Sequence, residues 1–279
     1  MTPDSAHRSA VSAGPERSTL TAKETAWLAY ARDVLGDEQH RQRCAALGGS
    51  PPHPGVDDPD LRWPGYLGDA AASGPCLMAV GNVHRNFASG RITAGLRDQL
   101  LVATSGWSTG EIDDADYLAA TRTVYRAGLA GWTVGKHIRF AVTAFGLGTE
   151  SLVYLNAARC QYPEIPPKLA RASSTKVALQ RLCLARFPLS DLVTALQPQA
   201  VLFSSTTAFD LAVDVRGRIA GRPAVCFHQL NGTLLRPLML GSDVVPVKVG
   251  RSIWAPALAA AGASGRRLTA SSGSGSPAT

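Results

Sequence analysis

The segment Cys76–Asn86 reads CLMAVGNVHRN, an uninterrupted apolar run followed directly by polar residues. Because the run lacks the polar alternation of a half-exposed strand, it predicts a β-strand that is covered on both faces. Three further short apolar runs have the same character. They are Ser151–Asn156 (SLVYLN), Ala200–Phe203 (AVLF) and Pro223–Phe227 (PAVCF).

Segments with helical spacing of apolar residues separate the first three of these runs. They are Asp113–Leu129, Lys136–Phe145, Ser174–Ala185 and Leu189–Leu196. Strands that alternate with helices are typical of a parallel sheet. We therefore expect an α/β fold, a three-layer α/β/α sandwich around a central, mostly parallel four-stranded sheet.

The rest of the chain divides into a domain and two polar ends. Residues 1–20 are expected to be a disordered arm, residues 21–260 a single domain, and residues 261–279 a disordered tail, because the tail is rich in small polar residues. The apolar spacing in Ala22–Leu47 predicts one amphipathic helix. Gly48–Gly74 is rich in Pro, Gly and Asp and is expected to be a long surface segment.

Composition limits the kind of protein. No stretch reaches the eighteen or so uncharged apolar residues that a membrane span needs, and the first twenty residues lack the apolar block of a secretory signal. A cytoplasmic monomer is the default expectation.

The net charge is +7, from 28 Lys and Arg against 21 Asp and Glu. This excess suits a polyanionic partner and suits simple solubility equally well.

Polar clusters follow three of the predicted strands. They are Gly81–Asn86, Asn156–Arg159 and His228–Gly232. Ligands of open α/β sheets bind at the carboxyl ends of the strands. We therefore expect these clusters to converge in one cleft.

The order and chemistry of three segments resemble the uracil-DNA glycosylase superfamily. The segments are VYLNAARCQYP (Val153–Pro163), LQPQAVLFSSTTAFDLAV (Leu196–Val213) and VCFHQLNG (Val225–Gly232). The resemblance implies that Asn156 pairs with the edge of a base flipped out of DNA. It also implies that His228 donates a hydrogen bond to the base carbonyl and stabilises the charge that develops there.

The chain departs from this superfamily in its first motif. Val83 stands where the family has Asp, Glu, Asn or Ala, and the Pro that usually follows is missing. No carboxylate occurs in the segment 81–95, so Asn82 or Asn86 is the candidate for positioning the attacking water, although either can equally cap a turn. Thr93 replaces the aromatic residue that the resemblance leads us to expect in stacking contact with the base. Phe87 is therefore the candidate for that stacking contact.

Three arginines are candidates for contacts with DNA phosphates, although arginines are often simply solvated. They are Arg85, Arg91 and Arg159.

Some branches of the superfamily hold an iron–sulfur cluster on four cysteines. Cys160 and Cys183 match two of those positions, but Cys44 stands alone where a pair is expected. Because two or three thiolates are too few for a closed cluster site, we expect neither a cluster nor a metal.

These observations leave three functions open. The first is a divergent DNA glycosylase that removes uracil or another deaminated or modified base. The second is a catalytically impaired module of the same fold that binds nucleic acid. The altered first motif favours it, and so do Gln229 and Leu230, which stand where the last motif of the superfamily has Pro and Ser. The third uses the same cleft for a free nucleotide or nucleoside, if the segment 104–147 caps the pocket and excludes duplex DNA.

Overall fold

The structure is a computed structural model that describes most of the chain. The described residues are 19–48, 64–85, 94–131, 133–162, 171–227, 234–236, 239–240 and 243–244. Helices and strands alternate along this part, so the predicted α/β class is confirmed.

Each of the four predicted apolar runs forms a strand. The strands are β2 (Leu77–Arg85), β3 (Leu152–Tyr162), β4 (Val201–Phe203) and β6 (Arg222–Phe227). They lie in the order β3-β2-β4-β6, and each neighbouring pair is parallel. β2 and β3 continue beyond the apolar runs into the polar residues that follow them, so part of each polar cluster belongs to a strand.

The sheet is larger and more mixed than predicted. The strand β1 (Tyr66–Leu67) pairs antiparallel with β3, and both β5 (Arg218–Ile219) and β7 (Leu234–Arg236) pair antiparallel with β6. A separate antiparallel pair consists of β8 (Met239–Leu240) and β9 (Asp243–Val244). The expectation of a four-stranded sheet was therefore wrong, because β1, β5 and β7 contain no apolar run of four or more residues by which the sequence could reveal them.

The predicted helices are present, with bounds that differ by a few residues. The helices of the described part are α1 (Ala22–Gly36), α2 (Glu38–Gly48), α3 (Asp69–Ser73), α4 (Ala94–Thr109), α5 (Asp114–Gly131), α6 (Thr133–Ala144), α7 (Arg171–Arg186), α8 (Leu189–Leu196) and α9 (Thr206–Ala212), with a 3-10 turn, η2, at Thr149–Ser151. None of the helices in the described residues is both long and apolar enough to cross a membrane.

The segment expected to form one helix over Ala22–Leu47 forms two, and Asp37 separates them. The backbone of Asp37 leaves the helical region, with φ −79° and ψ 85°. Its carboxylate Oδ1 accepts a hydrogen bond from the backbone N–H of His40 at 2.7 Å, the geometry of a helix N-cap. Asp37 therefore ends α1 and starts α2, which frees α2 to take its own direction.

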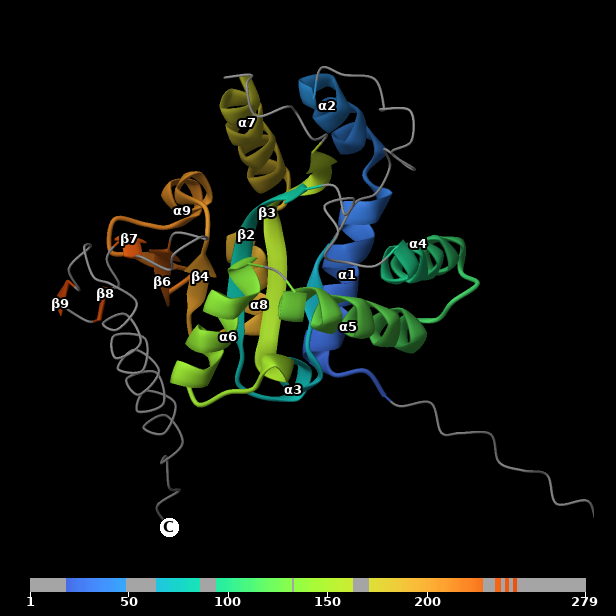
Figure 1. The fold of residues 1–279 in the computed structure, drawn as a ribbon, viewed down its shortest axis with the longest axis horizontal. Coiled ribbons are helices and arrows are strands. Elements are labelled where there is room, and N and C mark those ends of the chain that lie inside the picture. The colour runs from blue at the N-terminus through green and yellow to red at the C-terminus, as the bar shows by residue number, and fades with distance from the viewer. Residues whose placement is uncertain are drawn as a thin grey trace, which may run out of the picture.

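Side chains along the central strands alternate between two cores, one on each face of the sheet. The "α1 face" includes Met78, Val80, Val153 and Leu155, and α1, α8 and α9 pack on it. The "α6 face" includes Leu77, Ala79, Leu152 and Tyr154, and α6 and much of α5 pack on it. Figure 1 shows α6 in front of β2, α8 behind β2 and β3, and α5 beside β3, where it crosses in front of α1.

We expect replacement of Leu155 by Ala to lower the free energy of unfolding by about 2–5 kcal/mol, because the side chain is 0% exposed and its loss leaves a cavity. Val102→Ala is the control, since Val102 is 67% exposed on α4 and its loss should change stability by no more than about 0.5 kcal/mol. Urea denaturation of both variants measures the difference. Equal effects would show that Leu155 does not belong to the central core.

Candidate functional site

Asn156 is a buried polar residue in the middle of β3, level with the carboxyl ends of β4 and β6. It lies on β3 directly beside Gly81 of β2, and it is 4% exposed. A Cβ atom on Gly81 would stand 2.0 Å from Asn156 Oδ1 and 2.7 Å from the hydroxyl of Tyr154. Gly81 is therefore required for the amide of Asn156 to lie across the neighbouring strand.

Tyr154 fixes the orientation of this amide. Its hydroxyl donates a hydrogen bond to Asn156 Oδ1 at 3.2 Å. Burial raises the pKa of the Tyr154 hydroxyl well above its usual value, and the bond to Asn156 offsets this only in part. The hydroxyl therefore stays protonated and remains a donor. An amide oxygen has two lone pairs, so Asn156 can still offer one acceptor position and two N–H donors to a ligand.

Arg159 lies inside the molecule, three residues after Asn156. Its side chain is 0% exposed, and its Nε donates to the hydroxyl of Tyr30 on α1 at 2.6 Å. Its Nη1 donates to the backbone oxygens of Asn156 and Ala157, both at 2.6 Å. The expectation that Arg159 contacts DNA phosphates does not fit this position. The guanidinium instead ties the end of β3 to α1.

Asn82 faces away from Asn156. Because Gly81 is the residue that pairs with Asn156, the next residue of β2 points to the opposite face of the sheet. Asn82 Oδ1 accepts a hydrogen bond from Gln180 Nε2 of α7, and Gln180 Oε1 accepts one from the Ser205 hydroxyl at 2.8 Å. A pocket that contains both Asn82 and Asn156 therefore does not fit the described arrangement, and Asn82 holds α7 instead.

The remaining predicted site residues lie outside what the structure describes. Arg85 ends β2, but its side chain is not described, and Phe87, Arg91 and His228 lie wholly outside the described residues. The predicted convergence of three polar clusters is therefore tested only for the first two. Of these, the structure brings Gly81 and Asn156 together.

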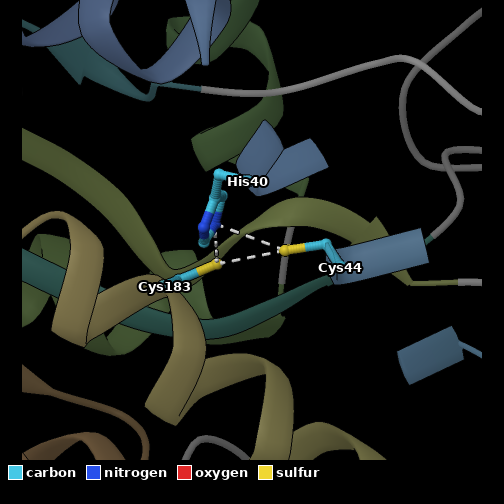
Figure 2. Close-up of side chains that lie close together, drawn as sticks. All are labelled: His40, Cys44 and Cys183. Carbon is cyan, nitrogen blue, oxygen red and sulfur yellow. Dashed lines mark hydrogen bonds between the residues drawn. The ribbon is translucent and has the colours of Figure 1, made fainter. Parts of the chain in front are cut away.

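A second polar cluster lies where α2 packs against α7. Figure 2 shows the side chains of His40 and Cys44 from α2 pointing toward Cys183 of α7. All three residues are buried, and the atoms that could bind a metal lie within 4.8 Å of one another. Sequence reasoning noted Cys44 and Cys183 but missed His40. The signal was the spacing of His40 and Cys44, which places two potential ligands on one face of a helix.

Comparison of the chain with protein-family models, with curated proteins and with solved structures found no match. The case for a function therefore depends on the residues described above. The most specific of them is the oriented amide of Asn156, since its position depends on both Gly81 and Tyr154.

We expect Gly81→Ala to lower the free energy of unfolding by about 1–3 kcal/mol, because the new methyl group meets the amide of Asn156. In the Asn156→Ala background the same substitution should cost at least about 1 kcal/mol less, because the obstructing side chain is gone. Urea denaturation of the four proteins measures this coupling. The matched control is Gly95→Ala on α4, where a Cβ meets nothing within 4 Å. Additive effects of the two substitutions would contradict the contact.

Proposed function

We propose that the chain is a divergent DNA glycosylase, which hydrolyses the N-glycosidic bond of uracil or of another deaminated or modified base in DNA. The observation that carries this proposal is the buried amide of Asn156, which Tyr154 orients level with the carboxyl ends of β4 and β6. This is the edge of an open α/β sheet where ligands bind. The resemblance of the strand and loop segments to the uracil-DNA glycosylase superfamily supports the same reading.

The orientation of the amide suits the edge of uracil. Uracil offers a donor at N3 and an acceptor at O4, and Asn156 offers the complementary pair through Oδ1 and Nδ2. Cytosine offers the reverse pattern and would require the amide to turn over. That turn would remove the acceptor that the Tyr154 hydroxyl uses, and a buried donor without a partner costs about 1–3 kcal/mol. The arrangement therefore favours uracil over cytosine.

The hydrogen bond from Asn156 Nδ2 to O4 of the base would also assist cleavage. Cleavage of the bond between the base and the sugar leaves the electron pair on the base, and the negative charge spreads to its O2 and O4 oxygens. A donor that is already in place in a buried site stabilises that charge more strongly than water does. Asn156 Nδ2 would act at O4, and His228 is the proposed donor at O2. Water then adds to the anomeric carbon of the sugar, and the proton that it loses neutralises the base anion.

A second candidate function is binding without cleavage. Two observations favour it: the segment 81–95 contains no carboxylate, and Asn82 is held by Gln180 on the other face of the sheet. A chain that keeps the base-binding amide but lacks a group to activate water would recognise a base and leave it attached. The partner in both cases is DNA that carries an altered base. We propose a cytoplasmic monomer, with Arg85 and Arg91 as the candidate phosphate contacts.

We expect Asn156→Ala to reduce the single-turnover rate of uracil cleavage by about 100-fold or more, because the buried donor to the leaving base is lost. The substrates are fluorescent single- and double-stranded oligonucleotides that contain uracil or hypoxanthine. The protein is produced in a host that lacks its own uracil-DNA glycosylase. Gln199→Ala is the matched control, since Gln199 carries the same amide just before β4, at the amino end of the sheet, and its loss should leave the rate unchanged.

Each other outcome has a clear meaning. If the wild-type protein cleaves nothing but shifts the uracil-containing oligonucleotides in a gel, the second candidate replaces the first. If it neither cleaves nor binds, both proposals fail. If Asn156→Ala cleaves uracil as fast as the wild type does, Asn156 does not hold the base.

A further inference from the structure

Three potential metal ligands meet between α2 and α7, away from the proposed base site. His40 Nε2 lies 3.2 Å from Cys183 Sγ and 3.3 Å from Cys44 Sγ, and the two sulfur atoms are 3.9 Å apart. All three side chains are buried, with exposed fractions of 4% for His40, 4% for Cys44 and 0% for Cys183. In Figure 2 the three point at a common centre from two different helices.

These separations match the ligands of a single tetrahedral ion. With Zn–S bonds of about 2.3 Å and Zn–N bonds of about 2.05 Å, two thiolates stand about 3.8 Å apart and a thiolate and an imidazole nitrogen about 3.5 Å apart. In the structure the two sulfur atoms are 3.9 Å apart, and the nitrogen–sulfur separations of 3.2 and 3.3 Å are about 0.2–0.3 Å below the zinc value. A four-iron cluster holds its thiolates farther apart, because each of them binds a different iron atom. The spacing therefore favours one ion over a cluster.

The surroundings of the cluster hold its side chains in place. The backbone N–H of Arg159 points at Cys183 Sγ at 3.4 Å, and such a donor stabilises a thiolate. The ring of His40 packs edge-on against Phe187, with 4.9 Å between the ring centroids. The carboxylate of Asp37, which starts α2, also accepts a hydrogen bond from Arg186 of α7 at 2.5 Å. The two helices are therefore fixed together at the point where the three ligands meet.

We propose that His40, Cys44 and Cys183 bind one zinc ion that fastens α2 to α7. Two thiolates and one imidazole form a donor set that zinc prefers over calcium or magnesium. The described residues supply three of the four ligands of a tetrahedral zinc ion, and because they come from two packed helices and are all buried, the ion would link α2 to α7. The proposal goes beyond the base-binding site and does not depend on its function.

The proposed ion would also order the end of β3. Cys183 of α7 accepts the N–H of Arg159, and the guanidinium of Arg159 bonds the carbonyl of Asn156. One turn before Cys183, Gln180 of α7 bonds Asn82 of β2. Binding of zinc by α2 and α7 would thus stabilise the carboxyl ends of both central strands without contact with the base.

The test measures metal in the full chain, purified without a histidine tag from zinc-supplemented medium. We expect about one zinc per chain by plasma mass spectrometry. Cys44→Ser and Cys183→Ser should retain less than a tenth of it. Cys76→Ser is the matched control, because Cys76 is equally buried but lies before β2 beside Lys23, and its variant should keep the zinc. Circular dichroism checks that each variant is folded.

Cobalt provides a readout on the wild-type chain, which does not depend on whether a variant folds. Cobalt(II) added to the zinc-depleted wild-type protein should give the charge-transfer and visible bands of a tetrahedral thiolate site. The proposal is overturned if the folded wild-type chain carries no zinc and takes up neither zinc nor cobalt. It is also overturned if the chain carries iron with inorganic sulfide, or if Cys76→Ser loses zinc as completely as Cys44→Ser does.

Discussion

The pairing of Gly81 with Asn156 is the constraint on which the rest of the site depends. It sets the register between the two longest parallel strands, β2 and β3, and so decides which residue faces which core. Only glycine leaves room for the amide across the strand, because a Cβ atom would stand 2.0 Å from Asn156 Oδ1. A slip of β3 by one residue would turn Asn156 to the α1 face, away from Gly81 and its base-binding position.

The two faces then take different tasks. On the α6 face, Tyr154 holds the amide of Asn156 in the position proposed for base binding. On the α1 face, Arg159 and Asn82 connect the strands to α1 and α7. The cluster of His40 with its two cysteines extends this support, since Cys183 bonds the backbone of Arg159. The proposed base binding by Asn156 on the α6 face therefore depends on the packing of α1, α2 and α7 against the strands on the α1 face.

The sequence reveals the features that local pattern determines. The four apolar runs are local, and the structure has a strand at each of them, but β3 continues past Asn156 to Tyr162. To predict which face of the sheet Asn82 occupies, one must know the register between the strands. To predict that Arg159 is buried, one must know the position of Tyr30, which is 129 residues away in the sequence. The contact between His40 and Cys183 spans 143 residues. The edge strands were missed because a strand of two residues, such as β1 or β5, is too short to show a pattern of apolar residues.

The most direct test of the account is whether a base contacts Asn156. Chain labelled with ¹⁵N only at asparagine would be titrated with free uracil and, separately, with cytosine, and the side-chain amide signals assigned by Asn156→Ala and Asn82→Ala. The account predicts that uracil shifts the Nδ2 signals of Asn156, that cytosine does so less, and that those of Asn82 stay in place. A shift at Asn82 with none at Asn156, or equal shifts with both bases, would contradict it.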